Sequence, residues 1–459
     1  MMRIGRLRPT PSIPSDGLER LRDRVGSSVV WTAAGHFGTE GLRLIGNIAL
    51  AYLLFPEAFG MMALVTAVLV GLQLFSDVGV APAIQRSQRG DDPEFLNTAW
   101  TIHVLRGLVL RLIACAIAQP IARFYDLPEL AVFLPVAAIS LIVAGFRPTR
   151  QDTASRHLRM QRVTMVNLGA QAVALVLIVA LAYVLRSVWA LVFGMILSET
   201  IRVIALHVFM PGHVDRLQIE RSAASELIHF GKWIFLSTAC AFAISQGDRL
   251  VLGHFVTLDM LGVFGIGLMI GSFPRMLGMT VLERLMISIY RDMPPTESSE
   301  NLARLRRFRA FFTSSLMALV LVLALAGPWL VSLLYDDRYA LAGPVVVMVS
   351  CVVLLQLIGM SYDRAALAAG DARGFFWLQA IRAVLHMLGL IAGAYMAGLG
   401  GALAGQAAAV ILSYGVQVRL ARRHGVWDMQ QDFCAMLGAL SMATIALWLH
   451  HEGVMRLFS

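Results

Sequence analysis

Residues 341–362, LAGPVVVMVSCVVLLQLIGMSY, form a long apolar run without a charged side chain. An α-helix needs about 20 apolar residues to cross the hydrocarbon core of a bilayer. Similar runs recur along the 459-residue chain, in which 58% of the residues are hydrophobic and only 15% are charged. Soluble domains carry about 25% charged residues. The sequence therefore predicts an all-α, polytopic membrane protein.

The apolar runs lie between loops that contain charged residues, proline or glycine. Six spans are predicted near 27–55, 59–84, 97–120, 129–146, 163–183 and 188–209. Six more are predicted near 232–255, 260–289, 310–334, 341–362, 375–397 and 399–418, and a thirteenth near 433–450. Residues 16–24, DGLERLRDR, predict a short amphipathic helix on the inner leaflet. The glycine pairs Gly389/Gly393 and Gly401/Gly405 have the spacing of close helix packing.

Basic residues fall mainly on one side of these spans. Of the 38 lysines and arginines, 26 lie in segments on the N-terminal side of the membrane, four on the opposite side and eight within spans. Cytoplasmic loops carry the excess of basic residues in membrane proteins. The N-terminus is therefore predicted to be cytoplasmic, and the net charge of +9 requires no nucleic-acid partner.

The predicted spans divide into two groups of six. The segments are a cytoplasmic N-terminus (1–26), an N-lobe (27–209), a cytoplasmic linker (210–231), a C-lobe (232–420) and an extra helix with the tail (421–459). A shift of 202 residues matches Trp31 with Trp233, Glu57 with Asp259 and Gly60 with Gly262. An even number of spans gives both halves one orientation, as in parallel repeats. We therefore expect two six-helix lobes, related by a pseudo-repeat, around a central cavity, with a thirteenth helix.

Several short stretches resemble one family in their order and spacing. They are LFPEAFG (54–60), FSDVGV (75–80) with AIQ (83–85), IARFY (121–125), VWALV (188–192), and DRLVLG (248–253) with LGVF (261–264). Together they resemble the polysaccharide-transport branch of the multidrug/oligosaccharidyl-lipid/polysaccharide exporter superfamily over residues 20–420.

This resemblance implies a function. Similar proteins move undecaprenyl-diphosphate-linked oligosaccharides from the inner to the outer leaflet of the bacterial inner membrane, with two lobes that rock around a central cavity. They commonly have twelve or fourteen spans. Residues 433–450 then either cross the membrane, which gives thirteen spans, or lie along it or re-enter it.

Charged residues within the predicted spans are the candidates for function. The arginines are Arg43, Arg106, Arg111, Arg202, Arg249, Arg275, Arg284 and Arg382, and the acids are Glu40, Asp77, Glu199, Asp248 and Glu283. Such a group is costly in a bilayer unless it faces a wet cavity or a partner. Surplus arginine suits an anionic substrate such as a diphosphate. The substrate-binding candidates are Arg275, Arg249, Arg43, Arg111 and Arg382, and the coupling or ion-pair acids are Glu199, Asp77, Asp248 and Glu40.

Depth and spacing predict partners for two of these arginines. Asp77 and Arg106 reach similar depth in neighbouring spans, as an ion pair that either locks the lobe or takes part in transport. Glu40 and Arg43 are three residues apart, so they share a face of the first span and can neutralise each other.

Glu199 and Arg275 are harder to assign. Glu199 either pairs with Arg202, three residues away, or is a protonatable coupling carboxylate. Arg275 follows Pro274, which predicts a kink in the eighth span, and it has no acid one turn away. We interpret Arg275 either as the phosphate-binding residue or as the partner of an acid on another helix, such as Glu199.

Asp248 and Arg249 interrupt the seventh span. Adjacent helical residues diverge by about 100°, so the two side chains cannot face one partner. One can line the cavity while the other reaches a neighbour or extends to the periplasmic headgroups. His386 lies one turn from Arg382 and is either a proton relay or a hydrogen-bonded core histidine.

No enzyme site is evident in the sequence. The single lysine, Lys232, does not follow a glycine-rich loop, which excludes a phosphate-binding loop of an ATP motor. No metal-binding motif is present, and no cofactor is expected. His254 and Asp259 match a short acyltransferase pattern, but two fixed letters in an outer turn are expected by chance.

The sequence favours a flippase for a lipid-linked repeat unit of an exopolysaccharide, capsule or O-antigen. The alternatives are a drug/cation antiporter of the same superfamily, which would need acids facing the cavity, and a membrane glycosyltransferase or polymerase, which usually has a long extracytoplasmic loop. The expected partners are the lipid-linked oligosaccharide, membrane lipids, and a polysaccharide polymerase with its export machinery. The expected state is a monomer in the bacterial inner membrane.

Overall fold

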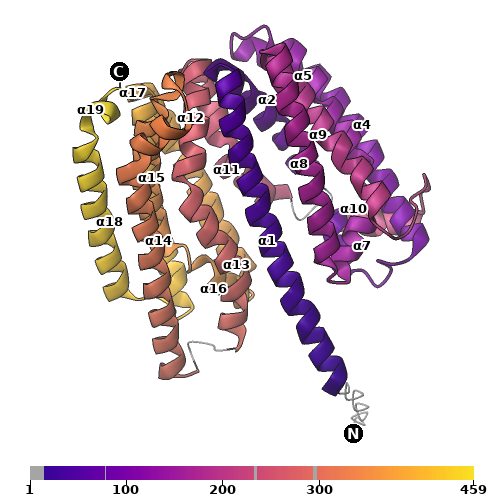
Figure 1. The fold of residues 1–459 in the computed structure, drawn as a ribbon. Coiled ribbons are helices and arrows are strands. Elements are labelled where there is room, and N and C mark those ends of the chain that lie inside the picture. Colours follow the sequence, from indigo (N-terminus) through magenta and orange to yellow (C-terminus); the bar gives the residue numbers. More distant parts are fainter. Residues whose placement is uncertain (1–14, 78, 232–234, 293–296, 459) are drawn as a thin grey trace.

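The computed structural model describes residues 15–77, 79–231, 235–292 and 297–458, and every regular element in these ranges is a helix (Figure 1). The first half contains α1 (Ser15–Leu53), α2 (Pro56–Phe75), α3 (Val80–Arg86), α4 (Pro93–Phe124), α5 (Leu130–Ala137), α6 (Ile139–Gly145), α7 (Arg150–Arg156), α8 (Met160–Leu185), α9 (Val188–Phe209) and α10 (Arg221–Gly231). The second half contains α11 (Phe235–Phe255), α12 (Leu258–Gly271), α13 (Phe273–Asp292), α14 (Ser299–Leu334), the 3₁₀ turn η1 (Asp337–Tyr339), α15 (Ala342–Gly359), α16 (Asp363–Ala368), α17 (Ala372–Arg423), α18 (Met429–Leu449) and α19 (His451–Met455). The predicted all-α class is confirmed.

Many of these helices have the length and composition of membrane spans. Among the described residues, eight helices could cross a membrane, or up to ten if each of two bent pairs forms one span. One bent pair joins α5 and α6 to α7 at 56°, and the other joins α12 to α13 at 48°. Pro274 lies just after the second bend and cannot donate a backbone hydrogen bond there. The predicted kink beside Arg275 is confirmed, and the protein is a multi-pass membrane protein.

Some boundaries differ from the predicted spans. Residues 16–24 do not form a separate interfacial helix, because α1 continues through them without a break. The second span ends at Phe75 instead of residue 84. The chain turns there, because Gly79 adopts a left-handed φ of 68° just before α3 begins. Asp77 stabilises this turn by accepting a hydrogen bond from the Gly79 N–H at 2.9 Å. Lys232 and Trp233 lie outside the described residues.

The predicted eleventh and twelfth spans form a tight hairpin within α17. Helical geometry is interrupted at Gly398, which has a φ of 56°. A Cβ added to Gly393 would lie 2.0 Å from the carbonyl oxygen of Gly401, and one on Gly405 would lie 1.9 Å from that of Gly389. The two arms are therefore in backbone contact, which confirms the close packing predicted from the glycine spacing.

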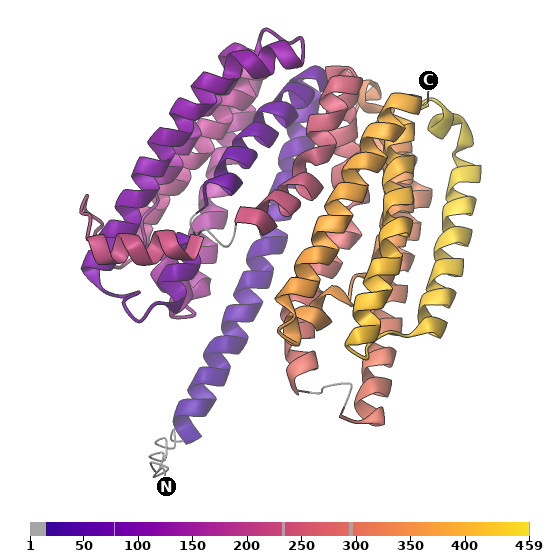
Figure 2. The same ribbon diagram turned by 180° about the vertical axis from the view of Figure 1, so that it is seen from behind.

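The helices of the two halves stand on different sides of the molecule (Figures 1 and 2). They meet near the end opposite to the N-terminus, where α2 packs against α11 and α12. Helix α18 stands upright beside α14 and α15 and does not lie across the end of the bundle (Figure 1). The described chain begins and ends at opposite ends of the bundle.

The contact between α2 and α12 brings the two backbones together. A Cβ on Gly60 would lie 1.9 Å from the carbonyl oxygen of Leu258, and one on Gly262 would lie 2.0 Å from that of Pro56. Pro56 and Leu258 begin the two helices and have the same 202-residue separation as the two glycines. The contact is therefore reciprocal, as a local two-fold relation between the halves produces.

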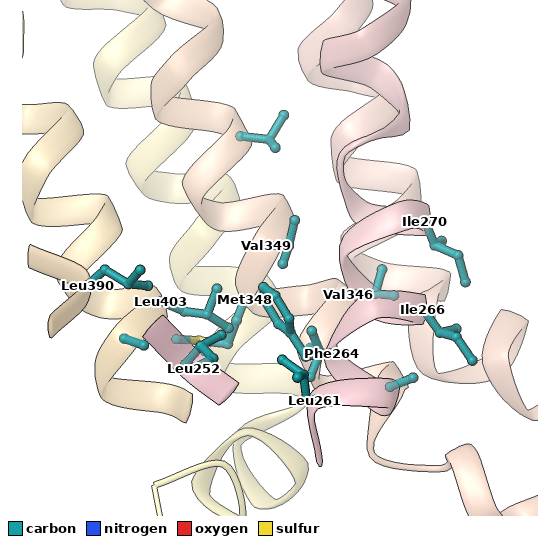
Figure 3. Close-up of a cluster of buried hydrophobic side chains, with 14 of the residues drawn as sticks. Leu252, Leu261, Phe264, Ile266, Ile270, Val346, Met348, Val349, Leu390 and Leu403 are labelled. Carbon is teal, nitrogen blue, oxygen red and sulfur yellow. The ribbon is translucent and has the colours of Figure 1, made fainter. Parts of the chain in front are cut away.

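A hydrophobic core holds the second half together where α11, α12, α15 and α17 meet. Figure 3 shows Leu261 and Phe264 of α12 close to Met348 of α15, with Leu252 of α11 and Leu403 of α17 beside them. Helix α15 is apolar on all sides, and 78% of its span is buried within the protein. A helix that is apolar all round is typically enclosed by others, so α15 is the central support of this half.

A buried polar network attaches α18 to the bundle. Arg309 of α14 and Asp432 of α18 are 2% and 5% exposed, and their side chains lie 3.3 Å apart. Asp432 also accepts hydrogen bonds from the hydroxyls of Tyr362 and Tyr414, at 2.9 and 2.6 Å. The guanidinium of Arg309 stacks over the Tyr362 ring. Both buried charges are thus compensated, which makes α18 an integral part of the second half.

The linker between the halves is attached to the first half. The backbone N–H of Gln218 donates to Thr101 at 2.9 Å, and its side chain accepts a hydrogen bond from Asn97 at 2.9 Å. Arg89 and Glu220 form an ion pair at 2.6 Å. The linker then forms α10, which packs against α3 and α4. The sequence predicted a linker here but not this helix.

We expect Gly262→Ala to destabilise the protein, because the new methyl group would overlap the Pro56 carbonyl. Overpacking of this kind costs about 1–3 kcal/mol. Gly265→Ala is the matched control on the same helix, because nothing lies within 4 Å of its added Cβ, and it should gain about 0.5–1 kcal/mol from helix propensity. Thermal unfolding in detergent measures both. Equal melting temperatures for the two variants would show that the helices do not touch at Gly262.

We expect Asp432→Ala to cost about 3–5 kcal/mol, because it leaves the buried charge of Arg309 without a partner. The control is Glu300→Ala, which removes an exposed partner of Arg304 and should cost about 0–1 kcal/mol. The measurement is the unfolding midpoint of purified protein, with protease sensitivity of α18 as a second readout. A small effect of both variants would contradict the anchoring role of the network.

Candidate functional site

A cavity of about 230 Å³, lined by both polar and apolar side chains, lies in the second half, between α11, α13, α15, α17 and α18. Its charged and polar lining consists of Arg275, Gln356, Asp363, Gln379, Arg382, His386, Ser413, Tyr414 and Gln417. Two of the substrate-binding candidates from the sequence, Arg275 and Arg382, therefore share one cavity. The short helix α16 places Asp363 on the same wall.

Arg275 is the less compensated of the two cations. Its side chain makes no hydrogen bond or ion pair with any residue that the structure describes, although the charge of Asp248 acts on it. The Oε1 atom of Gln356, on the same wall, is buried and also has no hydrogen-bond partner. A guanidinium has five N–H donors, so Arg275 can offer several donors to an anion in the cavity.

Arg382 is already paired. Its guanidinium donates to the carboxylate of Asp363 and to Oε1 of Gln379, the second at 3.1 Å. Asp363 also accepts a hydrogen bond from Nε2 of Gln417 at 3.0 Å. An anion that bound Arg382 would have to compete with Asp363 for its guanidinium. Arg275 is therefore the more accessible of the two arginines for an anion in this cavity.

Asp248 and Arg249 face different surroundings. Asp248 is 9% exposed, and one of its oxygens accepts a hydrogen bond from Gln406 at 2.9 Å. Nε2 of His386 lies 2.7 Å from the same oxygen. Arg249 instead donates to Gln246, one turn back on α11, at 3.0 Å. Asp248 is thus linked through His386 to the cavity wall, and Arg249 is directed elsewhere.

Arg43 and Arg111 do not line this cavity. Arg43 forms an ion pair with Glu40 at 2.6 Å, and its side chain is 52% exposed. Arg111 donates to the carbonyl oxygen of Pro135 at 2.7 Å, just before α5 ends. The guanidinium of Arg111 therefore provides a hydrogen-bond donor for the Pro135 carbonyl, next to the break between α5 and α6.

Asp77 and Arg106 come together at the end of α2. Their side chains lie 3.9 Å apart, but the closer contacts of Arg106 are with the Ser76 hydroxyl, at 2.8 Å, and the Gln73 carbonyl. Because these contacts hold the last turn of α2, the arrangement favours a structural lock over a role in transport.

Glu199 has a different partner from those considered in the sequence. Arg147 donates to Glu199 at 2.6 Å, and Arg202 donates to Asn167 at 3.0 Å. The predicted pairing of Glu199 with Arg202 is therefore wrong, as is the pairing of Glu199 with Arg275. The reason is that Arg147, just past the end of α6, reaches back to α9.

Three partners of the charged residues were not recognised in the sequence. They are Asp363 of the cavity wall, Gln406 beside Asp248, and Arg147 beside Glu199. Asp363 and Arg147 lie at span ends, and Gln406 carries no charge. For Asp363, the available signal was its position as the first acid after the apolar run 341–362. No group of three or more metal-ligating side chains is present among the residues that the structure describes.

Comparison with known proteins identifies relatives. Residues 49–344 match a family model described as polysaccharide biosynthesis protein. The chain is 23% identical over 370 residues to the succinoglycan biosynthesis transport protein ExoT of Rhizobium meliloti (strain 1021), which covers 78% of this chain and 72% of that protein. It is 20% identical over 298 residues to the amylovoran biosynthesis protein AmsL of Erwinia amylovora, covering 64% of this chain and 76% of that protein.

Solved transporter structures share the fold. The lipid II flippase MurJ, in an inward closed conformation, matches with a TM-score of 0.63 at 10% identity, over 92% of this chain and 98% of that chain. An inward-facing MATE family transporter of the MOP superfamily matches with a TM-score of 0.61 at 14% identity, over 83% and 95%. Since the family model covers more than half of the chain, this protein belongs to the family of polysaccharide biosynthesis proteins, and it shares the fold of MATE transporters and MurJ.

Proposed function

We propose that this protein is a flippase that carries an oligosaccharide linked to undecaprenyl diphosphate from the inner to the outer leaflet of the bacterial inner membrane. The observation that supports this most is Arg275, a cation with unused donors in a cavity within the second half. A diphosphate supplies the anionic oxygens that such a guanidinium binds. The similarity to a succinoglycan transport protein supports a substrate of this class.

The mechanism that we propose is alternating access between an N-lobe (27–209) and a C-lobe (232–420), joined by the linker. The basic residues favour a cytoplasmic N-terminus, so the substrate would enter from the end of the bundle at which α1 begins. The contact of α2 with α12 lies at the other end and would have to open for release (Figure 1). The protein would act as a monomer and deliver the lipid to a polymerase.

A drug/cation antiporter is less well supported. The charged lining of the cavity includes two arginines, Arg275 and Arg382, against the single carboxylate of Asp363. This balance disfavours a cationic substrate, because a bound cation would meet Arg275, whose guanidinium forms no ion pair with a described residue.

We expect Arg275→Ala to reduce flipping of a fluorescent undecaprenyl-diphosphate oligosaccharide in proteoliposomes at least tenfold. Hydrogen bonds to a charged group contribute about 1.5–3 kcal/mol each, and about 1.4 kcal/mol changes a rate tenfold. Arg275→Lys should keep part of the activity. Arg304→Ala, which removes an exposed arginine of α14, is the control and should be without effect. Normal transport by a folded Arg275→Ala variant would exclude this role.

The acid best placed to couple transport to protons is Asp248, because its carboxylate meets His386 of the cavity wall. The other charged groups near it are Arg249 and Arg275. We expect Asp248→Asn to abolish the acceleration of flipping by an imposed pH gradient but to leave slow downhill flipping. Glu40→Gln is the control, because Glu40 is paired with Arg43. Retention of the pH response in Asp248→Asn would assign coupling to another group or to the membrane potential.

A further inference from the structure

The first half contains a polar cavity that the proposed function does not use. It has a volume of about 180 Å³ and lies between the end of α2, the middle of α4, the end of α6 and the start of α7. Its polar lining consists of Gln73, His103, Arg106, Arg147, Thr149, Gln151 and Asp152. Helix α7 lies toward the same end of the bundle as the N-terminus (Figure 1), so the cavity belongs to the end that we assign to the cytoplasm.

Much of the hydrogen-bonding capacity of this lining is unused. The side chains of His103 and Asp152 make no hydrogen bond with the residues that the structure describes. Oε1 of Gln151 is buried without a partner. Arg147 uses its Nε atom for Glu199, which leaves its terminal nitrogens available. Buried polar groups are almost always hydrogen-bonded in folded proteins, so this lining is suited to a polar occupant.

The mixture of charges restricts what the occupant can be. Arg147 is paired with Glu199, and Arg106 lies 3.9 Å from Asp77, so the arginines of this cavity already have acidic neighbours. A free anion would therefore meet the carboxylate of Asp152, and a cation would meet the two guanidinium groups. The hydroxyl groups of a sugar carry no charge and both donate and accept hydrogen bonds. The cavity is smaller than the ~300–1,000 Å³ of pockets for drug-sized ligands. A small ligand rich in hydroxyl groups, such as one sugar ring, therefore suits its chemistry.

The cavity also adjoins a second hollow in the first half. Gln151 lines both this cavity and a larger one, of about 540 Å³, between α1, α8 and α9. The larger one contains further polar groups, among them His36, Asn167 and Arg202. Gln151 therefore lies between the two hollows.

We propose that the cavity around Gln151 and Asp152 is a sugar subsite that binds one ring of the transported oligosaccharide through its hydroxyl groups. This inference rests on the proposed function, in which Arg275 of the second half holds the diphosphate. The two parts of the substrate then bind different halves of the protein. A glycosylated lipid engages both halves, whereas the bare diphosphate lipid engages only the second.

The test compares two lipids in proteoliposomes: undecaprenyl diphosphate, and the same lipid bearing glucose or galactose. We expect Asp152→Asn to slow flipping of the preferred glycosylated lipid about tenfold, the effect of losing about one hydrogen bond to a charged acceptor. Flipping of the bare lipid should not change. Arg275→Ala should slow both lipids. Gln151→Leu is a second cavity variant, to be used if Asp152→Asn does not fold.

The matched control is Asp91→Asn, at the same end of the first half but outside this cavity. Asp91 is charged, because its hydrogen bond to His157 holds its pKa below the usual value. This variant should flip both lipids normally. An equal loss for both lipids in Asp152→Asn, or no preference of the wild-type protein for either sugar, would overturn the subsite. If the wild-type protein flips none of the lipids, the proposed function fails, and the subsite with it.

Discussion

The approach of α2 and α12 to backbone contact is the constraint on which the arrangement of the two halves depends. It is possible because Gly60 and Gly262 have no side chain at the crossing point. The same approach brings Glu57 and Asp259 close enough for their charges to interact. Two carboxylates this close share a proton or repel each other. The halves are thus joined by close packing and by hydrogen bonds, such as that of the Tyr339 hydroxyl to the Leu54 carbonyl at 3.0 Å, and these contacts would have to break in the proposed transport cycle.

The helices could largely be predicted from hydropathy, because a bilayer requires long apolar segments. The apolar run at 341–362 forms α15. This helix carries no charge because it is enclosed by other helices of the second half. The errors arose where hydropathy carries no information. The second span ends early because Gly79 has a left-handed backbone, and α1 extends past its apolar part because an aqueous boundary does not itself break a helix.

The site could be predicted in part. Counting charges within spans identified Arg275, and the bend at Pro274 confirmed that its surroundings are irregular. The partners of the charged residues could not be predicted, because they come from helices far away in the sequence. Asp248 contacts residues 138 and 158 positions later, and Glu199 contacts Arg147 across 52 positions. Such pairs depend on which helices are neighbours, and spacing along one helix does not report this.

The two halves preserve their contact but differ in the chemistry of their cavities. The first turns of α2 and α12 correspond at a constant separation of 202 residues and touch reciprocally. Both cavities contain two arginines, one aspartate and neutral amides, but the pairing differs. In the second half Asp363 pairs with Arg382, and Arg275 has no ion pair among the described residues. In the first half the arginines have acids outside the cavity as neighbours, and Asp152 has no ion pair among the described residues. A substrate of uniform chemistry would favour similar linings in both halves. Linings that differ in this way suit a substrate with two unlike ends, one anionic and one neutral and rich in hydroxyl groups, which is the chemistry of a lipid-linked oligosaccharide.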